Sequence, residues 1–363
     1  MLIGDSGPMC ASVGRFAGIQ QRRNSEECEA RRQLVELPDC GTCRIITREE
    51  QPSRQDSADI WFAHNVMASI TRELRPSASL VPALDASLLD LTPVQREFLR
   101  ISVCEDEDEL RKRLLDLQER SYERYPYPCI RFFHFVSLFM SENAVYQAVL
   151  KAGRQGNTVL IDVGCCMGTD VRKLVADGYP AQNVIGTDLR QDYIDQGYEL
   201  YQDKGNTSGI RFFAADIFEL PFDSESTASA DLPVPISDVS SFQQLRHRVT
   251  HIYTGALFHL FDEATQYAIA LRLASLLDLQ SGAKKVIFGR HSGLEQEGMI
   301  NDKMKRVRYG HSPASWTRLW EKVLAEVGWQ EGVEVQAEMT VHPAPSDAGA
   351  NGSKMMWWSV TVG

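Results

Sequence analysis

The sequence has no hydrophobic run long enough to cross a bilayer, and its first residues lack the marks of export. No apolar stretch approaches the roughly 18 residues that a transmembrane helix needs. The opening residues, MLIGDSGPMCASVGRFAG, have neither the basic head nor the continuous apolar centre of a signal peptide. We therefore expect a soluble, cytoplasmic protein without membrane partners.

The chain also lacks an excess of positive charge. It has 38 Lys and Arg residues against 49 Asp and Glu, which is a formal net charge of −11. Sequence-independent binding to nucleic acid requires a basic surface, so we expect no nucleic-acid partner. A small molecule is the expected partner, and a homodimer is left open.

Cysteine is too sparse for a disulfide scaffold, with eight residues in a chain of 363. The one C-x-x-C pair, Cys40 and Cys43, has no second pair and no nearby His with which to form a zinc site. A redox pair would be expected on a βα turn, whereas these residues stand in a polar segment. We expect incidental thiols and no metal site.

Three regions follow one another along the chain. Residues 1–57 are polar and show no sustained period, which predicts a mobile tail. Residues 58–155 carry apolar residues at helical spacing, most clearly over 106–125, and predict a helical layer or lid. Residues 156–363 form the expected ligand-binding domain, with a Ser/Asp/Pro-rich surface insertion at 223–247.

In the last region, segments typical of buried strands alternate with amphipathic helices. The strand-like segments are residues 158–164, 183–189, 210–218, 249–261 with an exit loop, 283–293, 333–341 and 354–363. Thr92, Asp262 and Ser312 are placed to cap helices. The alternation predicts an α/β, Rossmann-like fold with a mostly parallel seven-stranded sheet. Two strands in succession at the end predict an antiparallel C-terminal hairpin.

An acidic residue stands at the end of each of the first three predicted strands: Asp162, Asp188 and Asp216. Ligands of open α/β sheets bind beyond the carboxyl ends of the strands. Asp188 follows the first turn at the separation where an acid reaches ribose hydroxyls, and Asp216 could contact an adenine amino group or a water. We expect these acids and their neighbours Leu189 and Ile217 to bind a nucleoside. The structural alternative is that the acids cap helices or turns.

The first predicted strand runs into the turn G-C-C-M-G at 164–168. A dinucleotide-binding turn requires G-x-G-x-x-G, so the spacing disfavours an NAD-dependent oxidoreductase. Asp162, Gly164 and Gly168 instead resemble motif I, D/E-x-G-x-G-x-G, of the class I S-adenosylmethionine (SAM)-dependent methyltransferases. The resemblance implies that this turn passes the methionine part of SAM.

Two cysteines fill the middle of this turn. Cys166 stands where the middle glycine of motif I is usual, and a thiol fits there if the residue avoids a positive φ. We interpret Cys165 and Cys166 as small residues that pack near the cofactor, with Cys165 among the cofactor contacts. A nucleophilic role is the disfavoured alternative.

Several sequence segments resemble those of the methyltransferases of fungal meroterpenoid and polyketide–terpenoid pathways. They are YPYPCIR, IDVGCCMGTDVRKLVADGYP, NVIGTDL, LFHLFDEATQ and GHSPASWTRLW, within residues 120–363. The resemblance implies a class I methyltransferase fold and SAM as cofactor, with S-adenosylhomocysteine (SAH) as product. It also implies a small apolar secondary metabolite as acceptor. The best-known members esterify the carboxyl of a farnesylated aromatic acid, and others of related sequence methylate hydroxyls.

The chemistry of the acceptor decides whether a general base is needed. Methyl transfer requires the nucleophile within about 3 Å of the methyl carbon in a dry pocket. A carboxylate is already ionised at neutral pH and needs only a clamp, whereas a phenol, with a pKa of about 10, benefits from a base. His259, after the fourth strand, and His291, after the fifth, are the candidate catalytic residues. Either could instead have a packing role.

An aromatic segment before the first strand supplies candidate acceptor-binding residues, because an apolar acceptor needs an apolar wall. They are Tyr125, Tyr127, Arg131, Phe133 and His134. The alternatives are packing in the core for the aromatic residues and an ion pair with a helix acid for Arg131.

The sequence thus favours an O-methyltransferase that forms a methyl ester on a small apolar acid. A phenol or hydroxyl O-methyltransferase is the first alternative. A non-catalytic SAM-binding scaffold is the second, suggested by Cys166 and by the serine-rich insertion.

Overall fold

The structure is a computed structural model. It describes residues 81–205, 207–222, 234–278, 281–301, 307–329, 332–340 and 353–363. All of these residues belong to one compact unit. The expected tail at 1–57, the Cys40–Cys43 pair and the start of the expected helical layer lie outside the described residues.

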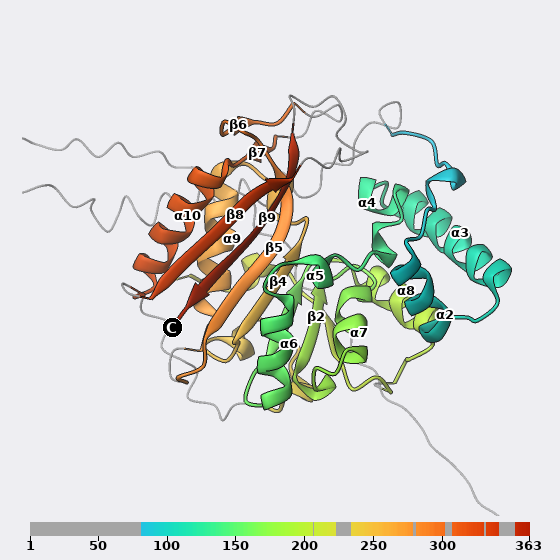
Figure 1. The fold of residues 1–363 in the computed structure, drawn as a ribbon, viewed down its shortest axis with the longest axis horizontal. Coiled ribbons are helices and arrows are strands. Elements are labelled where there is room, and N and C mark those ends of the chain that lie inside the picture. The colour runs from blue at the N-terminus through green and yellow to red at the C-terminus, as the bar shows by residue number, and fades with distance from the viewer. Residues whose placement is uncertain are drawn as a thin grey trace, which may run out of the picture. The chain divides into compact units, whose positions relative to one another are not determined.

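A seven-stranded sheet lies at the centre, in the order β3-β2-β1-β4-β5-β9-β8 (Figure 1). Its strands are β1 (Leu160–Val163), β2 (Val184–Asp188), β3 (Arg211–Ala214), β4 (His251–Gly255), β5 (Lys285–Gly293), β8 (Val333–Thr340) and β9 (Lys354–Val362). The first five strands are parallel, and β9 runs antiparallel to both β5 and β8. The predicted parallel sheet with an antiparallel C-terminal hairpin is confirmed.

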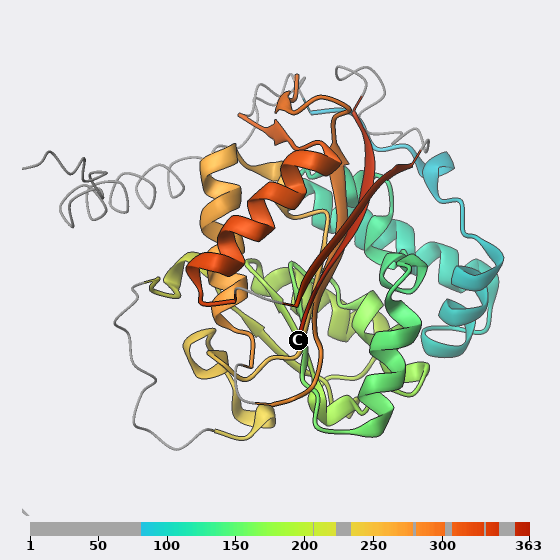
Figure 2. The same ribbon diagram turned by 60° about the vertical axis from the view of Figure 1, so that its left-hand side comes forward.

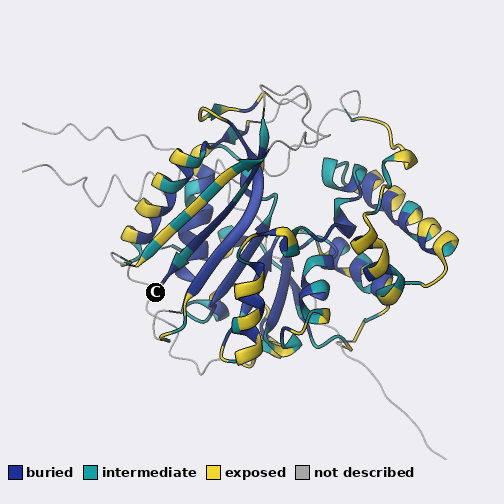
Figure 3. Ribbon diagram, viewed as in Figure 1, coloured by how far each residue is buried: buried dark blue, intermediate teal, exposed yellow. Residues whose placement is uncertain are grey.

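Helices cover both faces of the sheet, as Figure 2 shows. One face carries α6 (Tyr146–Gln155), α7 (Thr169–Ala176) and α8 (Gln191–Tyr201), and the other carries α9 (Glu263–Ser275) and α10 (Pro313–Glu326). Leu160 packs with the first set and the adjacent Ile161 with the second, because successive strand side chains point to opposite faces. Both faces are covered, so the central strands are largely buried, whereas the edge strand β8 is half-buried to exposed (Figure 3).

The predicted helix caps are present. Thr92 accepts from the Gln95 N–H at the start of α2 (Pro93–Ser102), and Asp262 accepts from the Thr265 N–H at the start of α9. Ser312 forms a capping box with Ser315 at the start of α10. Each cap satisfies one of the N–H groups that lack a partner within the helix.

A helical layer packs on α8, on the side of the molecule away from β8 (Figure 1). It comprises η2 (Ala86–Leu88), α2, α3 (Glu107–Arg124), α4 (Pro128–Arg131) and η3 (His134–Val136). The next helix, α5 (Phe139–Glu142), packs with α6 and α7 instead. Leu99 and Leu114 of this layer share a core with Tyr193 of α8 and with Met167 of the glycine turn. The layer is therefore attached directly to the loop that follows β1.

The surface insertion expected at 223–247 needs correction where it is described. Residues 223–233 lie outside the described residues, but η6 (Ile236–Asp238) and η7 (Gln243–Leu245) frame a fully buried Phe242. Phe242 packs edge-on against Phe213 of β3, with ring centroids 5.8 Å apart. The apolar side chains of this stretch pack into the core, whereas Ser237, Asp238 and Ser240 are exposed.

The remaining short elements are η4 (Ala181–Asn183), η5 (Ile217–Glu219), η8 (Phe258–Leu260) and a two-stranded ribbon, β6 (Gly298–Met299) with β7 (Tyr309–Gly310). The ribbon was not expected from the sequence, because its strands are too short to carry a pattern. It is fastened to η8, since the Tyr309 N–H donates to the Phe261 carbonyl over 2.9 Å. Among the helices described, none is long and apolar enough to cross a membrane.

Candidate active site

β1 and β4 are parallel neighbours in the sheet, but the helices that follow them lie on opposite faces. β1 continues into α7 on one face, whereas β4 continues into η8 and α9 on the other. Open α/β sheets bind their ligands at the carboxyl edge between two such loops, and we call this edge the crevice. The two loops meet there, because a Cβ added at Gly164 would lie 3.9 Å from Leu257 Cδ1.

Both loops contain residues in the left-handed conformation. Gly164, Cys166 and Gly168 have φ values of 87°, 53° and 70°, and Ala256 after β4 has 61°. Non-glycine residues adopt this region at a cost, and such residues gather at functional sites. The backbone at this crevice is therefore held in a shape that ordinary loops avoid.

The condition placed on Cys166 from the sequence is wrong, because this residue does take a positive φ. Its N–H donates to Asp188 Oδ2 over 2.9 Å, and this bond holds the turn in place despite the Cβ. Burial raises the pKa of the Cys165 and Cys166 thiols well above their usual value. Neutral thiols are poor nucleophiles, which favours the packing interpretation.

Asp188, at the end of β2, joins two loops. Its Oδ2 accepts from Cys166 and its Oδ1 accepts from the Arg190 N–H, also over 2.9 Å. Burial raises its pKa, and these backbone N–H groups oppose the rise. Each carboxylate oxygen can accept more than one hydrogen bond, so Asp188 can organise the turn and still receive ribose hydroxyls. Leu189 beside it is 38% exposed and offers an apolar surface to a base.

Asp162 is an unsatisfied acid within β1. It is 2% exposed, and its Oδ1 has no hydrogen-bond partner among the residues described. Burial raises its pKa well above the usual range, and the nearby Asp170 and Asp188 carboxylates raise it further. A buried acceptor without a donor is costly, so this atom is placed to receive a ligand group.

Asp216 has the capping role that was weighed as its structural alternative. Its Oδ1 accepts from the Phe218 N–H over 3.0 Å at the start of η5, and the neighbouring Ile217 is buried. The contact to an adenine base remains a prediction for this pair.

Two residues of the site were missed from the sequence, Asp170 and Arg290. Asp170, in the first turn of α7, accepts from the Met140 N–H of α5 over 2.9 Å. Burial raises its pKa to about 7, against the opposing effects of that bond and of Arg290. Acids are common in a first helical turn, which makes Asp170 inconspicuous in the sequence, and Arg290 stands beside His291, a more usual catalytic residue type. An arginine inside a strand predicted to be buried was the available signal.

The two candidate catalytic histidines lie in different places. His291 points to the α9/α10 face, where it is 1% exposed, accepts a hydrogen bond from Trp358 Nε1 over 2.9 Å and lies 4.5 Å from the Trp316 ring centroid. Burial lowers its pKa well below the usual value. His259 lies in η8, directly beyond the β4 turn, and its carbonyl accepts from Arg308 Nε over 2.7 Å. Of the two, His259 is the one on the loop that borders the crevice.

The five candidate acceptor-binding residues do not form one cluster. Tyr125 and Tyr127 stack on each other near the end of β2, with the Arg190 guanidinium 4.3 Å from the Tyr125 ring centroid. Phe133 is buried in the helical layer, and Arg131 donates to the Ala83 carbonyl over 2.8 Å.

His134 is the member of this set that lies near the end of β5. Its ring centroid is 5.4 Å from that of Phe139, and burial, followed by the Arg290 charge, lowers its pKa to about 3. A histidine with this pKa is neutral at physiological pH and cannot act as a cationic clamp.

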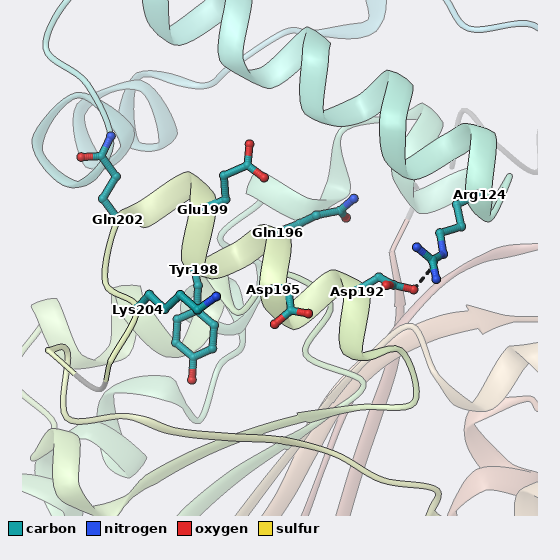
Figure 4. A pocket seen from close by; sticks show the side chains of 8 residues that line it. All are labelled: Arg124, Asp192, Asp195, Gln196, Tyr198, Glu199, Gln202 and Lys204. Atoms are coloured by element: carbon teal, nitrogen blue, oxygen red, sulfur yellow. Dashed lines mark ion pairs between the residues drawn. The ribbon is translucent and has the colours of Figure 1, made fainter. Parts of the chain in front are cut away.

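A cavity of about 570 Å³ lies on α8, away from this crevice (Figure 4). Its lining is Arg124, Asp192, Asp195, Gln196, Tyr198, Glu199, Gln202 and Lys204. Arg124 Nε and Asp192 Oδ2 form an ion pair of 2.9 Å across one end. This polar lining does not suit an apolar acceptor.

Two family models match the chain. One is described as meroterpenoid methyltransferase N-terminal domain and matches residues 84–136, which is most of the helical layer. The other is described as methyltransferase domain and matches residues 160–232, beginning at β1 and including the glycine turn.

Curated relatives extend the match over most of the chain. Methyltransferase trt5 of Aspergillus terreus is 30% identical over 63% of this chain and 77% of its own length. The chain belongs to this family of fungal methyltransferases. O-methyltransferase atr3 of Stereocaulon alpinum is 29% identical over 75% of this chain and 74% of its own length. Among solved structures, a putative SAM-dependent methyltransferase from Listeria monocytogenes covers 60% of this chain and 97% of its own, with a TM-score of 0.37 and 12% identity.

The residues at the crevice of this methyltransferase fit SAM as cofactor. SAM carries a sulfonium and an ammonium, and the crevice is bordered by the carboxyls of Asp162, Asp170 and Asp188. The unsatisfied Asp162 Oδ1 is an acceptor for an ammonium N–H. Gly164, at φ 87°, leaves the backbone open to close approach.

Proposed function

We propose that this methyltransferase transfers the methyl group of SAM to the carboxylate of a small apolar secondary metabolite and forms a methyl ester. The observation that carries the proposal is that two of the candidate histidines are poorly placed to act as a general base. His291 is enclosed by tryptophans on the opposite face, and burial lowers the pKa of His134 to about 3, which makes it a weak base. A carboxylate acceptor needs no base, because it is ionised at neutral pH.

In this proposal the β1 and β2 loops hold the cofactor. Bound SAM supplies an electrophilic methyl carbon on its sulfonium. Asp162 would accept a hydrogen bond from the ammonium, the turn at 164–168 would hold the methionine chain, and Asp188 with Leu189 would bind the ribose and the base. The work of this chain is to orient the two reactants and to exclude water.

The apolar part of the acceptor would lie against η8 and the β6–β7 ribbon. Leu260, Met299 and Val307 are 36%, 54% and 53% exposed. The ribbon and η8 are joined by the Tyr309–Phe261 and Arg308–His259 hydrogen bonds. Large exposed apolar side chains on joined segments are typical of a binding surface.

The test is to incubate the enzyme with methyl-labelled SAM and paired substrates, an alkylated aromatic acid and the matching phenol. We expect label in the acid only, and alkaline hydrolysis should release it as labelled methanol. Label in the phenol that survives alkali, as an aryl ether would, contradicts the proposal. A protein that binds SAM but labels neither substrate would be the scaffold alternative.

A phenol O-methyltransferase is the second candidate, and His259 favours it, because this histidine borders the crevice next to the β4 turn. His259→Gln should lower turnover only modestly with a carboxylate acceptor. A loss of several orders of magnitude in folded protein would indicate a general base and therefore a phenolic acceptor.

A further inference from the structure

Arg290 lies at the carboxyl end of β5, in the same crevice, and has no assigned role. We infer that it forms a carboxylate-binding site of the catalytic centre. The inference rests on the proposed function only in taking the crevice as the reaction site. The carboxylate comes either from the acceptor or from the methionine part of the cofactor, and the experiment below separates these two sources.

The backbone places Arg290 beside the β4 turn. It pairs with Gly255 of β4 and with Trp357 of β9, and its carbonyl accepts from the Ala256 N–H over 2.8 Å. His291, the next residue in the strand, points to the α9/α10 face. Strand alternation therefore sends the guanidinium to the face that carries α5 and α7, where Asp170 begins its helix.

The guanidinium is enclosed by aromatic rings. Arg290 is 6% exposed, and its Cζ lies 3.2 Å from the centroid of the Phe139 ring and 5.7 Å from that of Trp357. Stacking of this kind leaves the edge of a guanidinium as its donating side and restricts its rotation. Such a group is already ordered before a ligand arrives, which reduces the entropy lost on binding.

The donors of Arg290 are used less completely than those of other buried arginines. Arg172 pairs with Asp203 through Nε and Nη2, both over 2.8 Å, and Arg272 Nε donates to the Leu220 carbonyl over 2.9 Å. Arg290 Nε has no hydrogen-bond partner among the described residues, and no ion pair within that part of the chain includes Arg290. A buried cation in this state leaves part of its charge and donor capacity for another anion.

The surroundings of Arg290 explain why an incoming carboxylate would need it. The carboxyl groups of Asp170 (α7) and Glu142 (α5) interact electrostatically with the Arg290 guanidinium. Tyr253 of β4 and His134 of η3 are also within range of its charge. A carboxylate that enters among acids is repelled unless a cation receives it. The planar fork of arginine matches a carboxylate with two parallel hydrogen bonds.

The strand order bears on the source of the carboxylate. The cofactor turns follow β1 and β2, and β5 lies beyond β4, with about 4.8 Å between neighbouring strands. Arg290 is therefore on the acceptor side of the β4 turn, which favours the acceptor. The α-carboxylate of the cofactor extends past β1 in the same direction and is the second source.

The experiment measures preference for a carboxylate in two probe pairs by calorimetry. The acceptor pair is para-hexylbenzoic acid and para-hexylbenzamide, measured with saturating SAH. The cofactor pair is SAH and decarboxylated SAH. We expect the wild-type enzyme to prefer the carboxylate of at least one pair by tenfold or more, and Arg290→Gln to abolish that preference while changing the affinity of the neutral probe less than threefold.

Arg290→Lys is the second variant, because it keeps the charge and loses the fork. We expect it to retain part of the preference, which guards against misreading a folding defect. Arg248→Gln is the matched control. Arg248 precedes β4 at the opposite edge of the sheet and donates to the Gln244 and Val234 carbonyls, so its loss should leave both preferences unchanged.

The outcomes divide cleanly. Loss of preference in the acceptor pair assigns the acceptor carboxylate, and loss in the cofactor pair assigns the cofactor. If folded Arg290→Gln keeps the wild-type preferences, or the wild type prefers the carboxylate in neither pair, the inference is wrong and Arg290 only neutralises nearby acids. Methyl-ester formation by the wild type is measured separately, so the proposed function can fail while this result stands, or the reverse.

Discussion

The cofactor end and the acceptor end of the crevice are built from different parts of the chain. At the cofactor end, backbone groups do most of the positioning, as when the Cys166 and Arg190 N–H groups bind Asp188. At the acceptor end, side chains from separate elements meet, among them Arg290 of β5 and Phe139 of α5. A backbone-built site follows a short motif, whereas a side-chain-built site follows the tertiary fold.

The largest effect expected at the cofactor end comes from a residue that touches no ligand. A Cβ on Gly197 of α8 would lie 2.3 Å from the Met167 carbonyl oxygen in the glycine turn. Gly197→Val should lower the free energy of unfolding by about 3 kcal/mol through overpacking. It should also weaken SAH binding by roughly 100-fold, or about 2.7 kcal/mol. Calorimetry and chemical denaturation measure both.

Gly282→Val is the control, since a Cβ there meets no atom within 4 Å. Unchanged SAH affinity in Gly197→Val would mean that the turn does not need its contact with α8.

The next effect tests the link between β1 and β2. Asp188→Ala removes the acceptor of two backbone N–H groups, a loss of about 1–3 kcal/mol for buried donors. We expect SAH affinity to fall at least tenfold, whereas the matched Asp195→Ala on α8 should change it less than twofold. An Asp188 variant that binds SAH normally would contradict the cofactor assignment.

A smaller effect concerns pH. Burial raises the pKa of Asp170 to about 7 in the folded protein, above the ordinary value of 3.8. The folded state therefore holds a proton that the unfolded state releases, and stability without ligand should fall as pH rises from about 4 to 7. Asp170→Asn should reduce this slope in denaturation curves recorded across that range. An identical slope in wild type and variant would show that Asp170 does not titrate there.

The smallest effect concerns the left-handed turn residue. Cys166→Gly removes the strain of φ 53° but adds flexibility, so the free energy of unfolding should change by less than about 1 kcal/mol. Cys166→Val places a β-branched side chain at the same φ and should cost about 2 kcal/mol. Equal stabilities of the two variants, measured by denaturation, would show that the left-handed backbone at residue 166 is not strained.

The sequence signals for the cofactor end are local. Asp162, Gly164 and Gly168 stand within one short segment, and strand–helix alternation places that segment at a sheet edge. The same patterns located the strands and the caps at Thr92, Asp262 and Ser312. Local patterns failed at Cys166, whose φ depends on a hydrogen bond to a residue of the next strand.

At the acceptor end the sequence named chemistry-bearing residues but could not say which of them meet. His291 and Arg290 are adjacent, and only the pairing of β5 with β4 and β9 decides that the first faces tryptophans while the second faces the crevice. A shift of one residue in that register would exchange the two side chains. The family, the fold class and the antiparallel C-terminal hairpin follow from the sequence by itself. The choice between those neighbouring side chains belongs to the tertiary structure, because strands far apart in the chain set the register that directs them.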